Sequence, residues 1–140
     1  VTGYALAESV VLAGGYTNNC AGRVQNPANT ILLNTGARRL DFEVLRDLLV
    51  SGFTFSNFAN RIEFGNFNLS DTVQRIELAN NRFIEGGGGL EIGVEAGTAT
   101  SEIVLRNNLL WARTGDGNCV VRLSGDTGPD TTVRLRASNN

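Results

Sequence analysis

The residues that could carry chemistry in this sequence are mainly acidic and lie apart from one another. Glu63 and Glu91 are the two that could act as a pair, because each is a spacer between two apolar residues in a strand-like segment. Carboxylates that cleave a glycosidic bond lie about 5 to 9.5 Å apart, and neighbouring β-strands are separated by about 4.8 Å. A glycosidase pair is therefore one interpretation. We favour the other, a solvated sheet face, because Glu77 falls on the opposite strand face and Asp71 in a turn.

Most other catalytic and metal-binding chemistries are excluded by the absence of residues. The sequence has no His and no Lys, so Ser/His/Asp triads, Cys/His dyads, His-based metal sites and lysine bases are not available. Asp116, Asp126 and Asp130 offer oxygen ligands for a hard cation, but their spacing is undefined and Asp is common in turns. The run GGGG at 86–89 lacks the Lys and Ser/Thr of a phosphate-binding loop. We therefore expect no catalytic residue, no metal site and no cofactor.

Three aromatic side chains, Trp111, Tyr16 and Phe58, could stack on sugar rings if they are exposed. Trp111 follows Leu109 and Leu110, and a Trp in such a setting more often packs in a core or at a corner. Core packing is the interpretation we favour, and sugar binding is the alternative.

Composition favours one all-β domain over residues 1–140. Of the 140 residues, 41% are hydrophobic, 17 are Gly and only two are Pro, and Val, Ile, Leu and Thr come in short runs. The net charge is only −2 and the basic residues are all Arg, spread along the chain without a basic stripe, which argues against a nucleic-acid partner. No apolar run approaches the roughly 20 residues that cross a bilayer, so we expect no membrane span.

An internal repeat decides the predicted fold. RIELANNRF at 75–83 and EIVLRNNLL at 102–110 share the same order of aliphatic residues and Asn-Asn, 27 residues apart. Further copies are indicated upstream by Leu48, Val50 and Phe55 and downstream by Val133 and Leu135, aligned with Ile103 and Leu105. A second, interleaved series places these apolar pairs in register: Leu40 and Phe42, Ile62 and Phe64, Leu90 and Ile92, Val121 and Leu123.

Repeats of this length predict a parallel β-helix of about five coils, because stacked coils place like residues on like residues. Ile76 is then expected over Ile103, with Asn80 over Asn107 and Asn81 over Asn108 bonded amide to amide. The same alignment sets charged residues side by side: Arg75 with Glu102, Glu91 with Arg122, and Arg106 with Arg136.

Cys20 and Cys119 fall about three or four coils apart in this arrangement, some 15 to 19 Å at about 4.8 Å per coil. That separation is too large for one disulfide. We expect two unpaired cysteines, and the alternative is a bridge to another chain.

Several segments also resemble a known family. GGYTNNCAGR at 14–23, NPANTILLNTGARRL at 26–40 and VSGFTF at 50–55, with the Asn-Asn coils, resemble secreted bacterial right-handed parallel β-helix repeat proteins of the pectate-lyase-like solenoid superfamily. The resemblance covers about residues 10 to 140. It implies an extracellular or cell-surface location, and a fold that serves polysaccharide lyases and hydrolases, adhesins and surface-layer domains alike.

The two ends of the predicted coil leave VVLAGG at 10–15 and TVRLRASNN at 132–140 without a neighbour on one side. Either more coils belong to a longer chain, or separate copies stack end to end. We therefore expect a non-catalytic structural, adhesive or self-assembling surface module whose partners are copies of itself. The alternative is a carbohydrate-active enzyme or a polysaccharide-binding fragment, with a polysaccharide as its partner.

Overall fold

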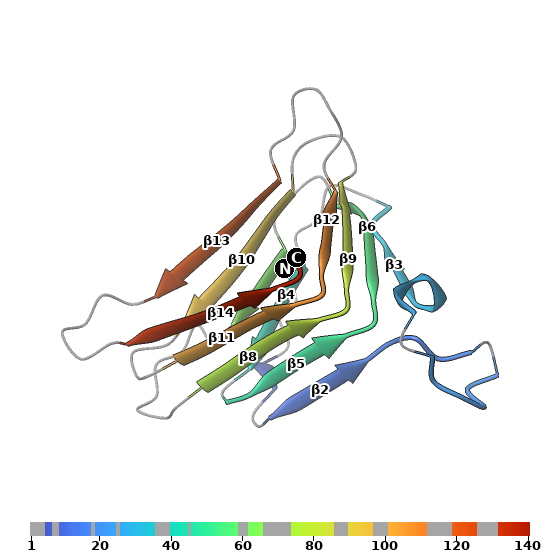
Figure 1. The fold of residues 1–140 in the computed structure, drawn as a ribbon, viewed down its shortest axis with the longest axis horizontal. Helices are drawn as coiled ribbons and strands as arrows, with labels where there is room; N and C mark the ends of the chain where they lie inside the picture. Colours follow the sequence, from blue (N-terminus) through green and yellow to red (C-terminus); the bar gives the residue numbers. More distant parts are fainter. Residues whose placement is uncertain are drawn as a thin grey trace.

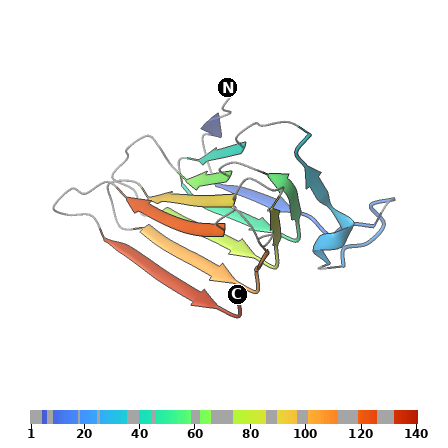
Figure 2. The same ribbon diagram turned by 90° about the horizontal axis from the view of Figure 1, so that it is seen from above.

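The chain forms fourteen short strands and one 3-10 helix, Pro27–Asn29, in the part described by a computed structural model (Figures 1 and 2). That part comprises residues 5–6, 9–17, 19–24, 26–35, 40–44, 46–58, 62–65, 74–85, 90–96, 101–111, 119–125 and 132–140.

The strands form three sheets, and every third strand along the chain belongs to the same sheet. Sheet 1 contains β1 (Ala5–Leu6), β4 (Leu40–Val44), β7 (Ile62–Gly65), β10 (Leu90–Ala96) and β13 (Cys119–Gly125). Sheet 2 contains β2 (Val10–Ala13), β5 (Leu48–Ser51), β8 (Gln74–Ala79), β11 (Ser101–Arg106) and β14 (Val133–Ser138). Sheet 3 contains β3 (Ile31–Leu33), β6 (Thr54–Phe58), β9 (Arg82–Glu85) and β12 (Leu109–Trp111).

All pairings between these strands are parallel. The chain therefore visits sheets 1, 2 and 3 in turn and returns one strand further along each sheet. Figure 1 shows sheets 2 and 3 meeting at a bend, with sheet 1 across from both. The prediction of an all-β protein with stacked parallel strands is confirmed, and the arrangement is compatible with a β-helix.

The repeated phrase is in register as predicted. Ile76 pairs with Ile103 in sheet 2, and Phe83 pairs with Leu110 in sheet 3. The phrase contains a corner, however, because sheet 2 ends before the Asn-Asn pair and sheet 3 begins after it. Each coil consequently has three strands, where the sequence indicated two series.

Two predicted registers are wrong by two residues. In sheet 1, Ile92 pairs with both Ile62 and Val121, so Leu90 does not align with Ile62. In sheet 2, Leu135 pairs with Ile103. A shift of two residues leaves the same side chains on the same face, so alternation of apolar and polar residues does not detect it.

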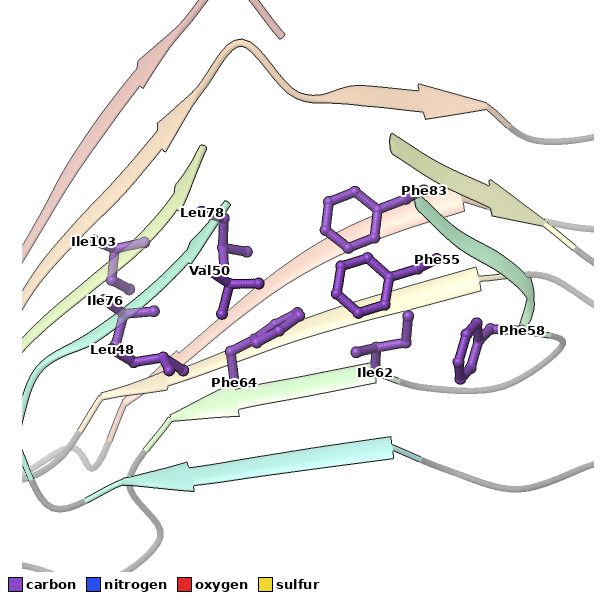
Figure 3. Packing of buried hydrophobic residues seen from close by; sticks show 10 residues of the cluster. All are labelled: Leu48, Val50, Phe55, Phe58, Ile62, Phe64, Ile76, Leu78, Phe83 and Ile103. Carbon is purple, nitrogen blue, oxygen red and sulfur yellow. The ribbon is translucent and has the colours of Figure 1, made fainter. Parts of the chain in front are cut away.

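Stacked phenylalanines fill the interior between sheets 1 and 3 (Figure 3). Phe55 and Phe83 stack with ring centroids 5.0 Å apart and an interplanar angle of 4°, and Phe42 and Phe64 stack equally closely. Phe64 meets Phe55 edge to face, at 6.0 Å and 80°. Such pairs add about 0.5 to 1.5 kcal/mol each beyond the burial of their area. The core is thus held by contacts between coils as much as within them.

Candidate functional site: the polar columns and the open edges

Two columns of asparagine run along the corner between sheets 2 and 3. In the outer column, Asn107 donates from Nδ2 to Asn80 Oδ1 at 3.1 Å, and Asn139 donates to Asn107 Oδ1 at 3.2 Å. These three residues have φ of 55°, 53° and 52°, the left-handed region that Asn tolerates better than most residues. Gly52, which precedes Asn80 by one coil at this corner, also has a positive φ, of 78°.

The inner column is more deeply buried. Asn81 Nδ2 donates to Asn108 Oδ1 at 3.2 Å, and Asn108 Nδ2 donates to Asn140 Oδ1 at 3.0 Å. The side-chain amides of Asn81, Asn108 and Asn140 also each donate to a backbone carbonyl of sheet 2 in the preceding coil. The acceptors are the carbonyl oxygens of Val50, Leu78 and Leu105, respectively. The predicted amide contacts are confirmed, and the columns extend to Asn139 and Asn140. The Asn-Asn pair at the end of the sequence was the available signal for this extension.

A chain of ion pairs crosses the outer face of sheet 2. Glu77 lies 2.6 Å from Arg106 and 3.0 Å from Arg75, which in turn lies 3.1 Å from Glu102. Arg136 completes the chain at 3.0 Å from Glu102. The predicted pair of Arg75 and Glu102 is confirmed. The predicted contact of Arg106 with Arg136 is wrong, because the corrected register places Arg136 beside Val104.

The arginines control the ionisation of Glu77. Burial of its side chain, which is 12% exposed, acts to raise the pKa. Hydrogen bonds from Arg106 and Arg75, together with their positive charges, outweigh that effect, so the pKa of Glu77 lies below its ordinary value of 4.5.

The register does not support the alternative of a carboxylate pair. Glu63 is paired in register with Asp41 on one side and Gly93 on the other, whereas Glu91 is paired with Val120. The register also separates Glu91 from Arg122, which pairs with Gly93. Both misplaced neighbours of Glu91 follow from the two-residue shift of β10. The interpretation of Glu63 as part of a solvated face is wrong for a different reason, because Glu63 is fully buried.

The remaining residues that the sequence offered for chemistry fall in two groups, those outside the described residues and those inside them. Asp71, Asp116, Asp126, Asp130 and the GGGG run lie outside them. In the remainder of the chain that is described, no three His, Cys, Asp or Glu side chains come close enough to hold a metal ion. Cys20 is an exposed free thiol, and Cys119 begins β13.

The three aromatic candidates separate by exposure. Phe58 is buried at 6% exposure, which removes it as a surface for sugars. Trp111 is 52% exposed, so the expectation of core packing is wrong for it, and Tyr16 is also exposed. Trp111 lies on β12 and, with Leu109 and the two β9 residues Arg82 and Ile84, lines an open hollow on sheet 3.

The exposed apolar residues are concentrated at the edges of the sheets. Of the ten large hydrophobic side chains exposed in the described residues, eight lie on the edge strands β2, β3, β12 and β14, namely Val11, Ile31, Leu32, Leu33, Leu109, Trp111, Val133 and Leu135. The sequence analysis named Trp111 as a possible exposed residue but did not mark the other seven as exposed, because they have the same types as the buried residues. Their place in the first and last copies of the repeat was the available signal.

Comparison with known proteins gives no match: no protein-family model, no curated protein and no solved structure is significantly similar to this chain. Among the residues that the structure describes, no helix has the length and apolar character needed to cross a membrane. The arrangement of strands, columns and exposed edges therefore carries the argument about function.

Proposed function

We propose that this chain is a non-catalytic structural module that associates with copies of itself through its open sheet edges. In this proposal it forms a right-handed parallel β-helix of about five coils. We place it outside the cell or at the cell surface, on the resemblance of its repeats to secreted bacterial β-helix proteins.

The concentration of apolar side chains on the edge strands is the observation that carries this proposal. Leu32 is 36% exposed on β3, whereas Phe55 and Phe83, which follow it in the same column of sheet 3, are at most 1% exposed. Edge strands offer unpaired backbone donors and acceptors, and proteins that stay monomeric commonly protect such edges with charges or short strands. Apolar edges instead favour association.

A structural role also agrees with the position of the acidic residues. A catalytic carboxylate has to reach its substrate, and the fully buried Glu63 has no access from solvent. Glu91, its proposed partner, is not in register with it. The geometry thus gives no support to the glycosidase pair.

Sizing of the 140-residue chain tests the proposal. Light scattering and sedimentation across a range of protein concentrations, with electron microscopy of the same samples, should detect species larger than the 15.0 kDa monomer. Leu135→Arg, on edge strand β14, should weaken association. Val24→Arg is the matched control, because Val24 is 57% exposed but lies outside the strands. A chain that is monomeric at every concentration would contradict the proposal.

A second candidate function is the binding of an acidic polysaccharide at the hollow on sheet 3. Trp111 and Leu109 supply an apolar surface on which sugar rings can stack, and Arg82 supplies a positive charge for the carboxylates of acidic sugars. Trp111 is the sole Trp of the chain, so its fluorescence reports directly on the site. Titration with polygalacturonate should change that fluorescence in the parent chain and less in Arg82→Gln. An unchanged spectrum would exclude this candidate.

A further inference from the structure

The C-terminal end of the stack has the form of a step. Sheets 1 and 2 each contain five of the described strands, whereas sheet 3 contains four. The chain rises by one strand spacing, about 4.8 Å, over each coil of three strands. If this rise is spread evenly over the three strands of a coil, β12, β13 and β14 lie at successively greater heights, and β14 stands about two-thirds of a spacing above β12. Figure 2 shows these three strands at one end of the molecule.

A copy stacked head to tail does not fit this step. If β1 of the second copy pairs with β13 and its β2 pairs with β14, its β3 lies two strand spacings above β12. A gap one strand wide would then remain in sheet 3. Leu109 and Trp111, both about half exposed, would stay uncovered.

A twofold rotation does fit it. We infer that two copies associate through their C-terminal ends about a twofold axis that passes through sheet 1 and the corner between sheets 2 and 3. The rotation places β13 against the partner's β13 and β14 against the partner's β12. Since the axis exchanges sheets 2 and 3, all three new pairings are one strand spacing apart, and all are antiparallel. Such a contact is self-complementary and closes a dimer.

The side chains of the two strands match this exchange. β14 carries Arg134 and Arg136 on its outer face, and Arg136 is 73% exposed. Pairing of β14 with another β14 would bring arginines together. Pairing with β12 instead places them beside Leu109 and Trp111, where a guanidinium can lie over an indole ring. The apolar side chains of β14, Val133 and Leu135, gain cover at the same time.

This inference rests on the proposed self-association, and blocking one end of the chain distinguishes the two. Val11→Arg charges β2, the N-terminal edge strand that a head-to-tail copy would place against β14 and its two arginines. A twofold contact at the C-terminal end predicts that Val11→Arg still forms a dimer by sedimentation. Head-to-tail stacking predicts a monomer, because each contact would bring the new arginine beside Arg134 and Arg136. A monomeric Val11→Arg with an assembling parent chain would overturn the twofold contact alone, and a monomeric parent would overturn the proposed function.

Charge substitutions in the Val11→Arg chain test the strand pairing itself. Trp111→Arg should convert the dimer to a monomer, because it faces the partner's β14 arginines. Trp111→Glu should retain the dimer through opposite charges. Adding Arg134→Glu and Arg136→Glu to Trp111→Arg should restore it. Equal behaviour of Trp111→Arg and Trp111→Glu, or failure of this restoration, would overturn the pairing of β12 with β14. Circular dichroism of each variant checks that it folds. We expect folding to be retained, because the Trp111 side chain is half exposed.

Discussion

The interior of the stack and its ends contain the same kinds of residue in very different surroundings. Ile76, Ile103 and Leu135 occupy one column of sheet 2 in consecutive coils. Ile76 and Ile103 are fully buried, whereas Leu135 is 49% exposed. Burial of an inward-facing residue in this fold is therefore set by whether a coil lies on both sides of it. An end of the stack is apolar because the repeat that builds the interior continues up to it.

The asparagine columns show the same contrast. Asn81 and Asn108 are buried at 1% and 5% exposure, and each has column neighbours on both sides. Asn140 donates to the carbonyl of Leu105 and accepts from Asn108, but it is exposed. The interior amides thus have few hydrogen bonds to gain from water, whereas the amide at the end can exchange protein partners for solvent.

The largest expected difference between interior and end concerns the aromatic residues. Phe55→Ala removes a fully buried ring that stacks on Phe83, and should lower the free energy of unfolding by about 3 to 5 kcal/mol. Trp111→Ala removes a larger ring from the edge strand β12, and should change it by about 0.5 kcal/mol or less at concentrations where the chain is monomeric. Denaturant unfolding measures both. Equal losses would contradict the contrast.

How much of the fold could be predicted from the sequence depended on whether a column of stacked residues lies next to an Asn-Asn corner. The columns of Ile76 and Asn80 were found because Asn-Asn fixes the alignment of the coils. The register of β10 was not, since Leu90 and Ile92 are equivalent under alternation and a shift of two residues leaves the pattern unchanged. The same shift created the apparent pairing of Glu63 with Glu91. The candidate site failed where it depended on register in sheet 1, which has no Asn corner to define it.

The exposure of individual side chains also could not be predicted from the alternation of apolar and polar residues. Trp111 follows two leucines as a core residue would, but Leu110 is the one that packs against the core, so Trp111 lies on the outer face of sheet 3 with Arg82 and Ile84. Glu63 presents the opposite case, because an outward position in an alternating strand is usually solvated, yet this one is fully covered. Alternation defines the two faces of a strand, and what lies over each face is decided by the rest of the chain.

A smaller effect is expected when the inner asparagine column is broken. Asn108→Ala removes the donor to the carbonyl of Leu78 and the acceptor for the backbone N–H of Asn81, both in the interior. Because unsatisfied buried groups are costly, it should lower the free energy of unfolding by about 2 kcal/mol. Asn140→Ala should cost under about 1 kcal/mol, since water can replace its bonds. Hydrogen exchange at the Asn81 amide provides a second readout. Similar losses in the free energy of unfolding for Asn108→Ala and Asn140→Ala would show that buried and exposed asparagines of the column stabilise the fold equally.

The smallest expected effect concerns the ion pairs of sheet 2. Glu77 lies between cations, and its pKa is lowered by Arg106 and Arg75 after the opposing effect of burial. A lowered pKa in the folded state contributes stability that is present above the ordinary value of 4.5 and is lost as the pH falls through the folded value. Glu77→Gln should therefore lower the free energy of unfolding at pH 7 by under about 1 kcal/mol, and this difference should shrink below pH 4.5.

Arg136→Gln is the matched change at the end of the stack. Its side chain is 73% exposed and bonds only to Glu102 among the described residues, so the loss at pH 7 should be close to zero. Unfolding measured from pH 7 to pH 3 compares the two variants. If the deficit of Glu77→Gln stays constant over that range, the carboxylate does not stabilise the fold through its charge. If Arg136→Gln lowers the free energy of unfolding as much as Glu77→Gln does, an exposed ion pair at the end stabilises the fold as much as an interior one. Exposure to solvent would then not explain the difference between the two regions.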